Sequence, residues 1–254
     1  LEFRRVLFRS VMIGALIAIG FSYFTHPLDP AGRTVDQISK LATEAAELLG
    51  TMAEGVTDGI DKEETARWLG AARELIAKVP ALRDQAMEAK QYARWYPLAA
   101  QEEADALYTR AVALDHAVEQ VRTIARTLFD AAVEGGLPDS INQQISDALS
   151  AASYAVSATV VELQDADEMP LDPEITDDVR QAGQELTYQL REDAEDFPTT
   201  QFARGISIAS NLERLADSID QSTPALHAIP EPEPPTEELI LRLPKPKRWR
   251  RGRR

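Results

Sequence analysis

Apolar residues recur along most of the chain with the spacing of an α-helix. In the clearest stretch, 99–134, the apolar positions alternate steps of four and three residues without interruption. This pattern is a heptad seam, and its alanines let a neighbouring helix approach closely. The helix-packing seam consists of Leu107, Ala111, Leu114, Val118, Val121, Ala125 and Leu128. At 1.5 Å per residue, a helix over this stretch is roughly 50 Å long, which favours an elongated antiparallel bundle.

The same periodicity predicts helices on the N-terminal side of the seam. One is expected over 35–52, with Thr34 as its N-cap. The next is expected over 62–96, where a single apolar stripe continues across Pro80. We therefore interpret Pro80 as a kink or short break within one packed face.

Further helices are predicted after the seam. Ser140 and Gln143 have the spacing of a capping box, and the helix they begin should reach about residue 163. An acidic loop then leads to helices over 174–197 and 200–222. No stretch has the pattern of a strand, so we expect an all-α fold with long helices in a bundle over 31–222.

The residues before the bundle predict a membrane segment. Residues 11–24 are apolar or nearly so, and two prolines between 26 and 30 break any helix that leaves them. Because this run is shorter than the roughly 20 residues that span a bilayer, we expect 11–25 to be the C-terminal end of a transmembrane helix. A buried helix of a soluble domain is the alternative. Residues 1–10 resemble the translation of a sequencing adapter, and we expect natural sequence to begin near residue 11.

Composition changes after residue 222. The stretch 230–235 contains only proline and glutamate, so we expect 223–254 to be a disordered linker with a basic tail. Residues 242–254 carry eight basic residues and no acidic one, whereas 11–241 carry 16 basic and 41 acidic residues, a net charge of −25. The tail predicts contact with anionic lipid headgroups, although the acidic body is a second target. The residues expected to contact lipid are Lys245, Lys247, Arg248, Trp249, Arg250, Arg251, Arg253 and Arg254.

Overall composition excludes several classes of protein. The 254 residues contain no cysteine, which excludes a disulfide scaffold, a cysteine-ligated zinc site and thiol catalysis. Only three histidines are present and they are scattered, so a histidine-rich metal cluster is excluded too. The net charge of −15 disfavours binding of nucleic acid by the body, and nucleic acid is not expected as a partner.

The carboxylates of the body do not have the spacing of a catalytic or metal site. The acidic loop 164–173 lacks the order of ligands that an EF-hand requires. Adjacent acidic residues such as Asp177 and Asp178 diverge by about 100° around a helix, so they do not converge on one substrate atom. The sequence has no phosphate-binding loop and no dinucleotide-binding glycine pattern. We therefore expect no enzymatic activity, no cofactor and no bound metal.

Two segments resemble the fusaric-acid-resistance/aromatic-acid-exporter (FUSC-like) family of bacterial membrane proteins. They are 92–97 (YARWYP) and 113–129 (ALDHAVEQVRTIARTLF). In some members of that family a helix ending in a similar turn precedes a helix with a similar run. The resemblance covers about 11–130, in the order of an apolar end, a proline break and long helices.

The resemblance implies that this chain is the C-terminal part of an inner-membrane transporter of the aromatic acid exporter type. The helical region would then be a cytoplasmic oligomerisation or regulatory domain of a bacterial plasma-membrane protein, packed as a homo-oligomer through the seam. Family membership implies a small aromatic acid bound in a membrane domain upstream, so no substrate residue is assigned here. The alternative is a singly anchored coiled-coil scaffold or sensor that binds protein partners.

Overall fold

The structure is a computed structural model, and it describes residues 30–95, 101–164, 174–194 and 197–222. These residues form six α-helices and one short 3₁₀ helix, with no strand among them. The all-α fold class is therefore confirmed. The elements are α2 (Pro30–Thr57), α3 (Lys62–Trp95), α4 (Gln101–Glu134), η1 (Asp139–Ile141), α5 (Asn142–Gln164), α6 (Glu174–Glu192) and α7 (Thr199–Ser222).

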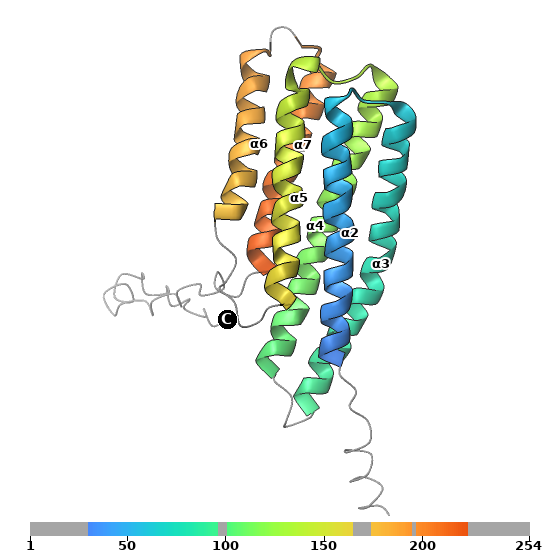
Figure 1. The fold of residues 1–254 in the computed structure, drawn as a ribbon, viewed down its shortest axis with the longest axis vertical. Coiled ribbons are helices and arrows are strands. Elements are labelled where there is room, and N and C mark those ends of the chain that lie inside the picture. Colours follow the sequence, from blue (N-terminus) through green and yellow to red (C-terminus); the bar gives the residue numbers. More distant parts are fainter. Residues whose placement is uncertain (1–29, 96–100, 165–173, 195–196, 223–254) are drawn as a thin grey trace, which may run out of the picture.

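Successive helices run in opposite directions and form a long bundle (Figure 1). Around the bundle the neighbours follow the order α2, α3, α4, α7, α6, α5, and α5 contacts α2 again. Two further contacts, α2 with α4 and α5 with α7, cross the middle of this ring. The core therefore lies between the four central helices α2, α4, α5 and α7, with α3 and α6 on the two flanks.

The two halves of the chain repeat one arrangement of three helices. In both α2–α3–α4 and α5–α6–α7, each helix contacts the other two. The first half has helices of 28, 34 and 34 residues, and the second half has helices of 23, 19 and 24 residues. As a result, α3 and α4 extend beyond α5, α6 and α7 at the end of the bundle where α2 begins (Figure 1).

Short connections between helices make the antiparallel arrangement possible. Asp61 begins α3, because its Oδ2 accepts hydrogen bonds from the backbone N–H groups of Glu63 and Glu64 at 2.8 and 3.0 Å. At the end of α4, Gly135 and Gly136 have φ angles of 112° and 83°, a conformation that favours glycine. These two local signals turn the chain at the same end of the bundle (Figure 1).

Two predicted helix starts are wrong. Thr34 does not cap α2, because the helix begins at Pro30, and Thr34 Oγ1 donates to the Pro30 carbonyl at 2.7 Å. Proline is well suited to the first turn, where its missing N–H has no helical partner. Ser140 lies inside η1, which has no side-chain cap, and Gln143 donates to Asp147 at 2.8 Å instead of completing a capping box.

The apolar stripe that crosses Pro80 belongs to one continuous helix, α3. Leu69, Ala72, Val79 and Leu82, on both sides of the proline, are buried. The prediction of a continuing packed face is confirmed. Helix α6, in contrast, ends at Glu192 and not at residue 197.

Within the described ranges, none of the helices combines the length and the hydropathy that a membrane span needs. The adapter-like residues 1–10, the predicted membrane segment 11–25 and the linker and tail 223–254 lie outside the described residues. What we predicted for these three segments stays a prediction.

Candidate functional site

The helix-packing seam of α4 is covered by other helices of the same chain. All seven of its residues are buried, with at most 8% of each exposed. Helices α2, α3 and α7 pack against α4. The expectation that this seam joins copies of the chain is corrected, because its surface is already used inside one bundle. A homo-oligomer must use other residues.

A small apolar pocket lies between the four central helices. It is lined mainly by apolar side chains of α2, α4, α5 and α7, with Arg110 of α4 as its charged residue. Its cavity volume is about 30 Å³. This is room for about two water molecules, so the pocket does not accept an aromatic ring in this arrangement.

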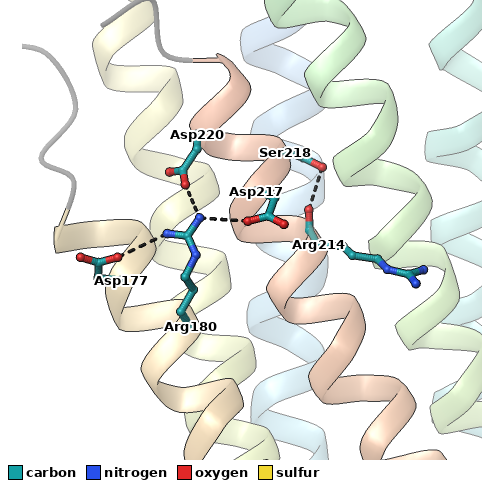
Figure 2. Close-up of polar contacts among 6 residues, drawn as sticks. All are labelled: Asp177, Arg180, Arg214, Asp217, Ser218 and Asp220. Carbon is teal, nitrogen blue, oxygen red and sulfur yellow. Dashed lines mark hydrogen bonds and ion pairs between the residues drawn. The ribbon is translucent and has the colours of Figure 1, made fainter. Parts of the chain in front are cut away.

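The densest polar cluster of the described residues surrounds Arg180 between α6 and α7 (Figure 2). Arg180 Nη1 donates to Asp177 Oδ1 at 3.3 Å, and Arg180 Nη2 donates to Asp217 Oδ1 at 3.0 Å and also to Asp220. Asp177 precedes Arg180 by one turn of α6, whereas the other two carboxylates come from α7. The cluster therefore joins the two helices that form one flank of the bundle.

The electrostatics of this cluster favour the charged form of Arg180. Partial burial lowers the pKa of Arg180, but hydrogen bonds to Asp220 and Asp217 outweigh it, so the pKa is raised above its ordinary value. The side chain of Arg180 is 26% exposed. The guanidinium of Arg180 therefore stays charged and contacts three carboxylates that come from two helices.

A groove of about 550 Å³ runs along the outside of α6 and α7. Gly183, Ile206 and Ala209 are among the residues that line it, together with charged residues of both signs. The groove holds neither a pair of carboxylates nor a histidine. Its lining therefore offers a surface for contact that carries both positive and negative charge.

Sequence reasoning missed the Arg180 cluster. Asp177 and Arg180 are visible in the sequence as a pair three residues apart, and Asp217 and Asp220 have the same spacing. Nothing in the sequence indicates that the two pairs meet, because Arg180 and Asp220 are 40 residues apart. The lipid-contacting residues predicted at 245–254 lie outside the described residues.

The structure is a helical bundle in which the Arg180 cluster joins two neighbouring helices, α6 and α7. In the described part of the chain, no group of three or more acidic or histidine side chains is arranged to hold a metal ion. No protein family model matches the chain, and no curated protein matches it in sequence. The function is therefore inferred from the geometry of the bundle and from the predicted segments attached to it.

Proposed function

We propose that the bundle is the cytoplasmic assembly domain of an inner-membrane protein of the aromatic acid exporter type. In this proposal residues 11–25 belong to a transmembrane helix, and the basic tail contacts anionic headgroups of the same membrane. The small aromatic acid would be handled by membrane-spanning helices outside the present chain. The bundle itself would hold copies of the protein together.

One observation carries the proposal: the described chain enters and leaves the bundle at the same end. Helix α2 starts there and α7 finishes there (Figure 1). Ile38 of α2 and Ile219 of α7 line the same pocket, so the end of α7 lies about two helical turns from the start of α2. The apolar run before α2 and the tail after α7 are therefore attached to one side of the molecule.

This arrangement suits a domain that stands on a membrane. The body is strongly acidic, and an anionic membrane repels it over a distance of about one Debye length, roughly 8 Å at physiological salt. A tail with eight positive charges offsets this repulsion at the attached end, at roughly 1 kcal/mol for each cation near the surface. Both predicted membrane contacts then act at the same end of the bundle.

The test is the membrane association of the full chain in bacterial cells. We expect the chain to sediment with membranes and to remain there after an alkaline wash. A variant with Leu16→Asp and Ile19→Asp should move to the soluble fraction, because each charge at the centre of a membrane helix costs about 2.5–3.5 kcal/mol. The matched control, Leu239→Asp with Leu241→Asp, introduces the same two charges in the linker and should stay in the membrane.

A chain that is soluble without any substitution would overturn the anchor. A separate observation distinguishes the exporter from the alternative: the number of hydrophobic segments encoded upstream of residue 11. Several segments, together with greater sensitivity of gene-deleted cells to benzoic acid, would support an exporter. A single segment would favour the singly anchored scaffold that binds protein partners.

A further inference from the structure

Helix α3 ends in an exposed tryptophan. Trp95 is 79% exposed, the largest exposed fraction among the large hydrophobic side chains that the structure describes, whereas Trp68 of the same helix is 3% exposed. An indole ring has a broad apolar surface and one N–H donor, a combination that favours the boundary between an apolar phase and water. A single exposed ring does not by itself identify a partner. The position of Trp95 in the bundle does.

Trp95 lies at the end of the bundle where α2 begins. Helices α3 and α4 extend past α5, α6 and α7 at this end (Figure 1). An ion pair between Glu44 and Lys78 sets the register of α2 against α3. From this pair α2 runs back 14 residues to Pro30, and α3 runs on 17 residues to Trp95. Trp95 therefore lies about 5 Å beyond the start of α2, on the side from which the chain enters the bundle.

The charges around Trp95 are nearly balanced. We call the exposed residues Arg94, Trp95, Glu102 and Glu103 the hairpin tip, because they stand where α3 ends and α4 begins. Arg33, in the first turn of α2, is exposed at the same end. The two arginines can donate hydrogen bonds to phosphate groups, whereas the two glutamates oppose attraction to a purely anionic surface. Such an end suits a surface that carries charges of both signs beside apolar groups.

We propose that the hairpin tip rests on the phospholipid bilayer, with the indole ring of Trp95 among the headgroups. The inference depends on the membrane attachment proposed above. It adds a point of contact that belongs to the folded bundle and is separate from the basic tail. Zwitterionic phospholipid is sufficient for this contact, because it depends on an indole ring at an interface and not on net charge.

The length of the connection to the membrane selects the bilayer as the partner. The predicted membrane segment ends at residue 25, and the five residues from there to Pro30 span at most about 17 Å. Headgroups fill roughly 5–8 Å of this distance. For a bundle that stands upright, Trp95 is about 5 Å closer to the membrane than Pro30 is. Even a fully extended connection thus leaves Trp95 within about 7 Å of the headgroups, and any shorter path brings it among them. A second copy or another protein would have to enter this narrow gap.

The experiment measures the fluorescence of the full chain in vesicles of phosphatidylcholine, with or without brominated acyl chains. Bromine atoms quench tryptophan only at short range. The chain has three tryptophans, so Trp249→Phe leaves only Trp95 and the buried Trp68 to emit. Brominated vesicles should lower this emission by at least about 30%, because Trp95 lies at the interface. Adding Trp95→Phe should reduce the loss to less than about 10%, because Trp68 lies in the core.

The matched control places a tryptophan at the opposite end of the bundle. Val133→Trp is made in the chain that carries Trp95→Phe and Trp249→Phe. Val133 is 48% exposed and lies near the end of α4, about 50 Å from the hairpin tip. Bromine should leave the emission of this variant unchanged. All of these chains keep residues 11–25, so they should float with the vesicles to the same extent.

Reversal of charge at the hairpin tip provides a second test, in vesicles that contain anionic phosphatidylglycerol. Glu102→Lys with Glu103→Lys replaces two negative charges by two positive ones. This variant should raise the quenched fraction of Trp95 emission at least about 1.5-fold, because lysines near the surface attract anionic headgroups. The control is Glu63→Lys with Glu64→Lys, an acidic pair in the first turn of α3 at the other end of the bundle. It should leave the quenched fraction unchanged.

The outcomes separate the hairpin tip from the anchor. A chain that floats with vesicles but emits equally with and without bromine would refute the contact and leave the anchor intact. A chain that does not float would overturn both. Equal quenching of Trp95 and of the Val133→Trp variant would show a bundle that lies along the membrane, against the proposal. Shielding of Trp95 from acrylamide without quenching by bromine would identify a protein as its partner. Circular dichroism must show the same helix content for all variants.

Discussion

At residue 55 the bundle leaves no room for a side chain. Gly55 lies in α2, and a Cβ atom added to it would come within 2.7 Å of Cη2 of Trp68. Trp68 is 3% exposed and belongs to the same core as α2, so it has little freedom to move away. A close contact between two helices therefore depends on the absence of one methyl group.

Gly55→Ala should lower the free energy of unfolding by about 1–3 kcal/mol, because overpacking outweighs the better helix propensity of alanine. Gly70→Ala is the matched control, since Gly70 is also helical and has no atom within 4 Å of an added Cβ. This control should raise the free energy of unfolding by about 0.5–1 kcal/mol. Urea unfolding followed by circular dichroism measures both, and a stabilising Gly55→Ala would contradict the described packing.

Arg180 is the residue whose loss should loosen α6 from α7. Arg180→Met should lower the free energy of unfolding by about 1–2 kcal/mol, because three carboxylates then face one another without a cation. Arg214→Met is the control: Arg214 is on α7, its side chain points away from the cluster (Figure 2), and no ion pair involves it among the described residues. We expect this control to change stability by less than about 0.5 kcal/mol.

The difference in stability between the parent chain and Arg180→Met depends on pH in a direction that can be predicted. The pKa of Arg180 is raised in the folded protein, so its contribution is complete below the ordinary arginine pKa and is lost only at more alkaline pH. The stability difference between Arg180→Met and the parent chain should therefore stay constant from about pH 6 to 10. A difference that fades within this range would show that Arg180 is not the group responsible.

Whole helices are the features most accessible to sequence reasoning. The apolar spacing predicts α7 over 200–222 and α4 over 99–134, and the two helices are Thr199–Ser222 and Gln101–Glu134. Both predictions succeed because uninterrupted apolar spacing indicates a buried face directly. Helix starts are harder, because a threonine near a start has the right chemistry either to cap the helix or to bond four residues back, as Thr34 does.

The sequence does not show which helix, of the same chain or of another, covers a given helix face. Heptad spacing shows that one face of α4 is buried, but the same spacing serves packing within a chain and packing between chains. The partners of Arg180 on α7 were equally hidden, because they are brought together only when α6 and α7 lie side by side. Sequence alone thus predicted the elements and not the contacts between them.

Leu128→Ala tests whether the α4 seam packs within one chain or between two copies of the chain. Leu128 is fully buried, so its truncation should lower the free energy of unfolding by about 2–5 kcal/mol, with no separate effect on association between copies of the chain. Val133→Ala, on the same helix at 48% exposure, should have a small effect on both quantities. A variant of Leu128 that dissociates copies without destabilising the bundle would restore the seam as an interface.

At the scale of the whole bundle, the even number of described helices determines where the chain enters and where it leaves. In the described part of the chain, six antiparallel helices return to the end where α2 begins, and connections between helices lie at the opposite end (Figure 1). Gly135 and Gly136 lie at that opposite end, in a turn that the positive φ angles of two glycines maintain. Within the described residues, the two ends of the bundle therefore differ: α2 begins and α7 ends toward one, and connections between helices lie at the other.

Because its two ends differ in this way, the bundle can serve as a spacer of known length. Exposed turns often accept inserted domains, and Gly135 is exposed. An insertion here would disturb two hydrogen bonds, from Gln201 Nε2 to the Gly135 carbonyl at 3.0 Å and from the Gly136 N–H to the Ala131 carbonyl at 2.7 Å. A fluorescent domain inserted between Gly135 and Gly136 would stand beyond the far end of α4, about 50 Å from the end where that helix of 34 residues begins. Under the proposed membrane attachment, energy transfer from such a reporter to a dye in the bilayer would measure the distance between the far end of the bundle and the membrane.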